Sequence, residues 1–150
     1  MIDKLYLDDL TIGDIFVNND SYEVTEEEII TFAKQYDPQV FHTDPEKAKE
    51  TFFNGLASSG WLTAAISMRL TAQTFPIAEG LIGANADLKW PSATRVGDEL
   101  TIVITIVNII PSKSKPQQGI VTYETVTKNQ HQEIRQICRA NILVFRRPTE

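Results

Sequence analysis

The sequence predicts one α+β domain, spanning residues 1–150, in which a curled antiparallel sheet wraps around a long central helix. The first observation behind this prediction is segment 60–74, whose only charge is Arg69, because a helix that is apolar on nearly every side is usually buried. The second is a C-terminal half rich in β-branched and alternating apolar residues, which is typical of neighbouring strands. A chain of 150 residues can bury enough surface for one such domain without disulfides. Another α+β sandwich with its helices on one face is the alternative.

The N-terminal half contains the shorter elements. We expect a strand within residues 12–24, entered through a turn at Gly13-Asp14. Thr25 and Glu28 have the spacing of a capping box, which predicts that a helix begins after Thr25. That helix should end at Asp37-Pro38, because the residue before a proline is pushed out of the α region.

The next signals mark a short helix and then the long one. Pro45 is well placed at the first position of a short helix, where its missing N–H costs nothing. Asn54-Gly55 predicts a turn, residues 58–60 predict the start of the long helix, and Phe75-Pro76 predicts its end.

Four strands are expected after the long helix, over residues 81–90, 99–110, 119–127 and 134–145. Both faces of 99–110 are largely apolar, so we expect both to be covered. A polar hairpin turn at 128–131 joins the last two strands. The back of the sheet would remain apolar in one chain, which predicts a homodimer or a higher homo-oligomer.

Composition disfavours several classes of function. The net charge is −6 and no block of Lys or Arg exists beyond Arg146-Arg147, which argues against nucleic-acid or anionic-membrane binding. No apolar run approaches the length of a membrane span, and the N-terminal segment lacks the apolar region of a signal peptide. With one cysteine, Cys138, no internal disulfide can form, so a cytoplasmic location is the expectation.

Asp37 and His42 are the first candidates for chemistry. Asp37 stands where a helix is expected to end, and His42 follows five residues later in an expected loop that contains a proline. A carboxylate and an imidazole at one point can bind and deprotonate a water, and can return a proton to carbon. The structural alternative is an aspartate that caps a turn beside an ordinary loop histidine.

Ser59 and Gly60 open the long helix. The N–H groups at a helix start carry partial positive charge and can polarise a carbonyl as an oxyanion hole does. Gly60 would let a ligand approach the backbone closely. The alternative is that Ser58 or Ser59 is an N-cap and nothing more.

For four further residues the sequence leaves open whether they bind substrate or have a structural role. Lys113 and Lys115, between two strands, could meet phosphates as point charges or could belong to a solvated loop. Trp61 and Trp90 are expected to be core or interface anchors more than ligand-stacking residues, although Trp61 is also a candidate substrate contact.

The sequence carries no motif for nucleophilic cysteine chemistry or for metal binding. His131 falls in the expected hairpin turn and Cys138 has no obvious activating partner. The chain has two histidines and one cysteine, far apart, so no metal site is expected.

Several short motifs occur in the order found in one known family. The chain resembles the MaoC-like dehydratases, a hot-dog family that includes the (R)-specific enoyl-CoA hydratases, over nearly its whole length. The motifs are Phe32-Ala33…Asp37…His42-x-Asp44-Pro45, Ala57-Ser58-Ser59-Gly60-Trp61, Leu88-Lys89-Trp90-Pro91 with Val96-Gly97-Asp98-Glu99-Leu100, and Ser112-Lys113-Ser114-Lys115-Pro116-Gln117-Gln118-Gly119.

The resemblance implies a hot-dog fold and a role for each site residue. Asp37 and His42 would hold the water that adds to the double bond, Asp37 leaning toward base and His42 toward proton donor. The backbone N–H of Gly60 would bind the thioester oxygen. The substrate would be an acyl-CoA thioester, hydrated reversibly without a metal or redox cofactor.

Two departures from the hydratase pattern leave alternatives open. The hydratases typically have Asp-x-Asn-Pro-x-His, whereas here Pro38-Gln39-Val40-Phe41 fills the gap. They often have His-Gly at the helix start, whereas Ser59 precedes Gly60 here. A hot-dog thioesterase and a non-catalytic acyl-CoA-binding subunit are therefore the other hypotheses. Thiol release would identify the first, and ligand-dependent thermal stabilisation without turnover would identify the second.

Overall fold

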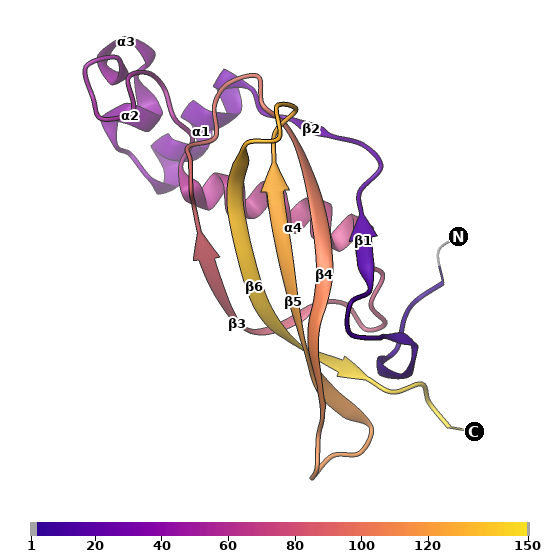
Figure 1. The fold of residues 1–150 in the computed structure, drawn as a ribbon. Coiled ribbons are helices and arrows are strands. Elements are labelled where there is room, and N and C mark those ends of the chain that lie inside the picture. The colour runs from indigo at the N-terminus through magenta and orange to yellow at the C-terminus, as the bar shows by residue number, and fades with distance from the viewer. Residues whose placement is uncertain (1–2, 150) are drawn as a thin grey trace.

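Six antiparallel strands form one sheet that curls over the long helix α4 in the computed structural model, which describes residues 3–149 (Figure 1). In chain order the elements are the 3-10 helix η1 (Leu7–Asp9), β1 (Ile15–Val17), β2 (Tyr22–Glu23), α1 (Glu26–Tyr36), α2 (Val40–Thr43), α3 (Pro45–Ala48), α4 (Gly60–Thr74), β3 (Ile82–Lys89), β4 (Glu99–Pro111), β5 (Gln118–Lys128) and β6 (Ile134–Phe145). The strand order is β1-β4-β5-β6-β3, and β2 also pairs with β4. This arrangement confirms the predicted α+β hot-dog fold.

The core lies between α4 and the concave face of the sheet. Leu62, Ile66 and Leu70 recur every fourth residue and so share one face of the helix, where all are buried. They join one apolar cluster with the inward side chains of the central strands, which include Leu100, Ile102, Ile104, Ile106, Val121, Ile142 and Val144. Burial of each such side chain stabilises the fold by about 2 kcal/mol, so the packing of α4 on the sheet is the main source of stability in this core.

The opposite face of α4 is uncovered within one chain. Trp61, Ala65, Met68 and Ala72 stand at helical spacing and are exposed. The prediction that α4 is buried on nearly every side is therefore wrong for the single chain, because the sheet covers only one side of the helix. The prediction for residues 99–110 fails for the same reason: alternate residues of β4 are buried, but the outward ones are only half-buried.

Helices α1, α2 and α3 gather at one end of the sheet, near the start of α4 (Figure 1). The Thr25 hydroxyl accepts from the Glu28 N–H at 3.2 Å, which confirms the predicted start of α1. The reciprocal half of the capping box is replaced, because the Glu28 carboxylate accepts from the Tyr22 hydroxyl at 2.8 Å. His42 lies in the four-residue helix α2, where a loop was expected. A helix this short has no apolar periodicity that a sequence could reveal.

The hairpin that joins β4 to β5 extends from the other end of the sheet, far from α2 and α3 (Figure 1). The predicted strands and the turn at 128–131 are confirmed to within a few residues. Within residues 3–149, no helix is long and apolar enough to cross a bilayer.

Candidate active site

Asp37 and His42 meet at the junction of α1 and α2. Asp37 is the C-cap of α1, and its N–H donates to the Ala33 carbonyl at 2.8 Å. A compact turn follows, in which the His42 N–H donates to the Gln39 carbonyl at 2.9 Å. This turn brings Nε2 of His42 to 3.4 Å from Oδ2 of Asp37. The two candidates are therefore neighbours in space, as their spacing suggested.

The orientation of the His42 ring is fixed by the backbone. Its Nδ1 lies 2.6 Å from the carbonyl oxygen of Ala57. Because a carbonyl only accepts, Nδ1 carries a hydrogen, and Nε2 is the nitrogen that faces Asp37 and can gain or lose a proton. The ring is 5% exposed and packs edge-on against Phe41, with 4.6 Å between ring centroids. His42 is thus held in one tautomer and one orientation.

The pKa of the Asp37 carboxyl is lowered below its ordinary value. Burial by itself raises this pKa, but hydrogen bonds from the Gln39 and Ser59 side chains and the charge of His42 outweigh it. The amide of Gln39 donates to Oδ1 at 2.6 Å. Gln39 stands where the hydratase motif has asparagine, so the departure retains an amide at that position. Asp37 is therefore ionised at neutral pH and presents Oδ2 as an acceptor.

The first turn of α4 leaves one N–H free. The Ser59 hydroxyl caps the helix by accepting from the Trp61 N–H at 3.2 Å. The N–H groups of Leu62 and Thr63 both donate to the Ser59 carbonyl, at 3.1 and 3.2 Å. In the described part of the chain the Gly60 N–H has no acceptor, and it points from the positive end of a 15-residue helix. It can accept a partial negative charge from a ligand oxygen.

Gly60 has a structural reason to be glycine as well. A Cβ at position 60 would lie 2.6 Å from Cε2 of the Trp90 ring, so any other residue would have to displace the indole. Trp90 is held in place because its Nε1–H donates to Oε1 of Gln136 at 2.9 Å. The sequence did not reveal this contact, because Gly60 and Trp90 come together only through the fold.

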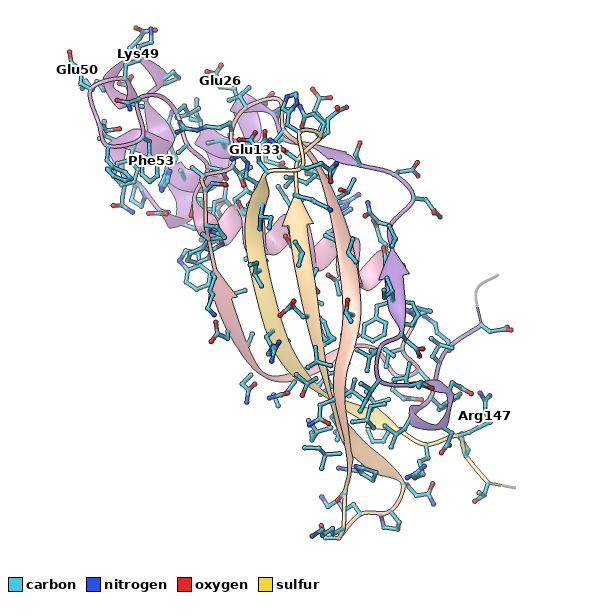
Figure 2. The ribbon with its side chains drawn as sticks, in the orientation of Figure 1. Glu26, Lys49, Glu50, Phe53, Glu133 and Arg147 are labelled. Carbon is cyan, nitrogen blue, oxygen red and sulfur yellow. The ribbon has the colours of Figure 1, made fainter. Side chains whose placement is uncertain are left out.

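His42 and Gly60 open onto one cavity of about 560 Å³, which we call the His42 cavity. Its walls are residues of the loop before α4, the start of α4 and the segment after β3, among them Phe52, Phe53, Trp90, Thr94 and Arg95. Figure 2 places Phe53 with α2 and α3, at the end of the molecule that carries the site. Asp37 is not part of this wall, so it meets the cavity through its contact with His42.

Arg95 fastens the loop that orients His42. Its guanidinium donates to three backbone carbonyls, those of Phe53 (2.7 Å), Gly55 (3.2 Å) and Leu56 (3.2 Å). The next carbonyl along the chain, that of Ala57, fixes the His42 ring. Arg95 is thus a positioning residue that sequence analysis missed, since its partners are backbone atoms about 40 residues earlier.

The other predicted site residues do not line the His42 cavity. Ser59 is fully buried. Its hydroxyl accepts from the Trp61 N–H at the helix start and helps to lower the pKa of Asp37, so its role as a substrate contact stays a prediction. Trp61 is 59% exposed and packs edge-on against Trp90 with 5.2 Å between centroids, outside the cavity wall. Neither tryptophan is a core residue of the single chain.

Lys113 and Lys115 are exposed in the connection between β4 and β5, at the opposite end of the sheet from His42 (Figure 1). One chain therefore does not bring these lysines to the His42 cavity. Cys138 is half-buried and burial raises the pKa of its thiol, with a further contribution from Asp87, which disfavours a nucleophilic role. His131 is exposed in its turn, as expected.

Comparison with known proteins shows to which family the chain belongs. A MaoC-like dehydratase from Rhodospirillum rubrum has a similar structure, with a TM-score of 0.94 and 47% identity over 97% of this chain and 99% of that one. Among curated sequences, the YdeM protein of Bacillus subtilis is 32% identical over 83% of this chain and 87% of its own length. An (R)-specific enoyl-CoA hydratase of Rhodospirillum rubrum is 28% identical over 68% of this chain and 67% of its own. The MaoC-like domain model matches residues 9–129, and the chain belongs to this family.

Proposed function

We propose that this protein catalyses the reversible hydration of a trans-2-enoyl thioester to a 3-hydroxyacyl thioester, of (R) configuration as in the similar hydratase. The observation that carries the proposal is that His42 and Gly60, whose N–H is free, line one cavity, with the ionised Asp37 carboxylate 3.4 Å from Nε2. Membership of the MaoC-like family and the similarity to an (R)-specific enoyl-CoA hydratase support it.

The Asp37–His42 pair would move the protons. The separation of 3.4 Å is longer than an ordinary hydrogen bond, so a water can contact both Oδ2 and Nε2. In the hydration direction, Asp37 accepts a proton from that water as its oxygen bonds to C3 of the acyl chain. His42, protonated at Nε2, donates its proton to C2. The proton on Asp37 then passes to His42, which restores the starting state.

The Gly60 N–H would stabilise the charge that develops on the thioester oxygen. Attack at C3 pushes electron density through C2 onto this oxygen, which becomes enolate-like. A fixed donor at a helix N-terminus needs no reorganisation when that charge appears. The reaction moves only water and protons, so the proposal includes no metal or redox cofactor.

We propose CoA as the carrier of the acyl group and a homo-oligomer as the active form. The exposed stripe of Trp61, Ala65, Met68 and Ala72 is an apolar helix face of the kind that packs on another surface. Among the strands of residues 3–149, β3 pairs with β6 alone, so its other edge can pair with the same strand of a second copy around a two-fold axis. Either surface, the exposed stripe of α4 or the free edge of β3, could contact a second copy of this chain. We place the protein in the cytoplasm, because its one cysteine can form no internal disulfide.

The test is a panel of enoyl-CoA chain lengths that starts with crotonyl-CoA. We expect loss of the enoyl absorbance without release of free thiol. Thiol release at the rate of turnover would instead identify a thioesterase. Thermal stabilisation by every acyl-CoA without turnover of any would identify a binding subunit.

A further inference from the structure

Strand β3 ends at the wall of the His42 cavity, and residues 90–95, which follow the strand, all line that cavity. Figure 1 shows α2 and α3 beyond the free edge of β3, on the side away from β6. Figure 2 places Phe53, a residue of the cavity wall, on the same side. A second copy of the chain that pairs with β3 would therefore lie beside the cavity and beside α2 and α3.

A two-fold axis would bring opposite ends of the two copies together. Antiparallel pairing of β3 with itself over its full length places the partner subunit's Ile82 opposite Lys89 of this chain. Through the registers of β6 and β5, Ile82 stands level with Ile110, one residue before the end of β4. The partner subunit's connection between β4 and β5 would therefore project past Lys89, toward the level of residues 90–95.

This β4–β5 connection, residues 112–117, is a turn of fixed shape that carries positive charge. The Ser112 hydroxyl accepts from the Lys115 N–H at 3.0 Å, and the Gln118 N–H donates to the Lys115 carbonyl at 3.2 Å. Lys113 and Lys115 are exposed, and within residues 3–149 neither ammonium group forms an ion pair with a carboxylate. The connection contains no acidic residue, so both charges are available to an anion from outside the chain.

The end of the chain that carries His42 is poor in such charges. Residues 26–50, which contain α1, α2 and α3, have seven carboxylates against three lysines. Among the described residues that line the His42 cavity, Arg95 is the only lysine or arginine, and three backbone carbonyls already engage its guanidinium. A CoA thioester carries its charge on phosphates, which are bound best by lysine and arginine. One chain therefore offers few cations to that carrier.

We propose that Lys113 and Lys115 of the partner subunit bind the phosphate groups of the CoA thioester that occupies the His42 cavity. Neighbouring strands lie about 4.8 Å apart, so the partner subunit's connection stands roughly 14 to 19 Å from β3 of this chain. The pantetheine arm between the thioester and the phosphates bridges a separation of this size. The basic connection and the acidic end of the other copy also attract each other, which favours this pairing. The inference rests on the proposed function, because it takes the ligand to be a CoA thioester and the protein to be a dimer.

The first test measures the binding of butyryl-CoA and of butyryl-pantetheine by calorimetry. Lys113→Gln/Lys115→Gln should bind butyryl-CoA about tenfold more weakly than the native protein does, because charge-assisted hydrogen bonds to phosphate are lost. Butyryl-pantetheine has no phosphate, so its affinity should not change. The matched control is Lys47→Gln/Lys49→Gln, which removes two exposed lysines at the site end of the same chain and should leave both affinities unaltered. Equal affinity of the native protein and Lys113→Gln/Lys115→Gln for butyryl-CoA, or a larger loss in the control, would overturn the inference.

The second test asks whether the lysines act in the site of the other chain. Dimers are assembled from one Asp37→Asn chain and one Lys113→Gln/Lys115→Gln chain, each with its own affinity tag. The site that retains Asp37 then faces the connection that retains its lysines. Its KM for crotonyl-CoA should equal the native value, with about half the native kcat per dimer, whereas the pure lysine variant should have a KM raised about tenfold. A raised KM in the mixed dimer would overturn the inference, because the lysines would then act within their own chain.

Binding of butyryl-CoA requires no turnover, so it separates this inference from the proposed function. A protein that hydrates no enoyl-CoA can still lose affinity for butyryl-CoA when the two lysines are replaced. A native protein that hydrates crotonyl-CoA as a monomer, shown by light scattering, would overturn this inference alone. A lysine variant that dimerises more weakly but binds butyryl-CoA normally would also overturn it, because the lysines would then contact the acidic end of the other copy and not the phosphates.

Discussion

The indole of Trp90 lies against Gly60, so closely that a Cβ at position 60 would be 2.6 Å from Cε2 of the ring. We expect Gly60→Ala to destabilise the protein by about 1–3 kcal/mol, because the added methyl must displace the ring. The displacement also moves the free N–H at the start of α4, so turnover should fall. Thermal unfolding and the rate of crotonyl-CoA hydration measure the two effects.

The double variant Gly60→Ala/Trp90→Ala separates the two roles of Gly60. Removing the indole leaves room for the methyl, so the cost of Gly60→Ala should be much smaller in the Trp90→Ala background. An equal cost in both backgrounds would show that the Trp90 contact does not explain the glycine.

Asp98 and Arg135 form a buried ion pair that should make stability depend on pH. Both side chains are less than 10% exposed, and Nε of Arg135 donates to Oδ2 of Asp98 at 2.9 Å. Burial by itself raises the pKa of Asp98. Hydrogen bonds from Arg135, the Arg95 N–H and Asn129, together with the charge of Arg135, outweigh this effect, so the pKa of Asp98 is lowered overall. A carboxyl with a depressed folded-state pKa stabilises the fold above its unfolded value, about 3.9, and loses that contribution as the pH falls through the folded-state pKa.

Asp98→Asn should therefore cost about 3 kcal/mol at neutral pH, where it leaves Arg135 buried without its partner. The same variant should lose less stability than the native protein as the pH falls below about 4. Urea unfolding at several pH values measures both. The exposed pair Glu124–Arg139 supplies the control, since Glu124→Gln should change stability by no more than about 0.5 kcal/mol. Identical acid dependence in the native and Asp98→Asn proteins would contradict this account.

Arg95 should affect catalysis through the position of His42. Lysine cannot reproduce three hydrogen bonds to the carbonyls of residues 53, 55 and 56, so Arg95→Lys should release this loop. We expect kcat to fall at least about tenfold because the ring loses its fixed position, and KM to rise because Arg95 and this loop also line the His42 cavity. Arg69→Lys, on the exposed side of α4, should leave kcat unchanged. A normal kcat for Arg95→Lys would rule out this positioning role.

The exposed stripe of α4 predicts a subunit contact. Ala65→Glu places a charge in the middle of that stripe without touching the core of one chain, so it should yield folded monomers. Gln73→Glu, exposed near the end of the same helix, should leave the oligomer intact. Light scattering coupled to size-exclusion chromatography gives the masses, and native masses for both variants would exclude α4 from the contact.

Local signals predicted most of the fold because they act over a few residues. The cap at Thr25, the stop before Pro38, the start of α4 and the alternation of β5 each depend on neighbours in sequence. Helix α2 was missed because four residues contain no period to detect.

The site was only partly predictable because its parts meet through tertiary contacts. The spacing of Asp37 and His42 indicated the pair, but the Ala57 carbonyl that orients the ring lies 15 residues further on. The contacts of Trp90 and Arg95 depend on how the segment after β3 packs on the start of α4 and on the loop before it. One signal was present in the sequence: Tyr123, Thr125 and Thr127 alternate with outward residues, which places polar groups on the inner face of the sheet.

The most direct test of the central claim is the rate at which the native protein removes the enoyl absorbance of crotonyl-CoA, compared with Asp37→Asn at equal concentration. Asparagine keeps the shape of the side chain but cannot accept the proton of water, so the account predicts hydration by the native protein and a loss of at least about 100-fold in the variant. The variant should remain folded, because Asp37 is at the edge of α1 and is only partly buried. Equal hydration rates for the native protein and a folded Asp37→Asn variant would contradict the account.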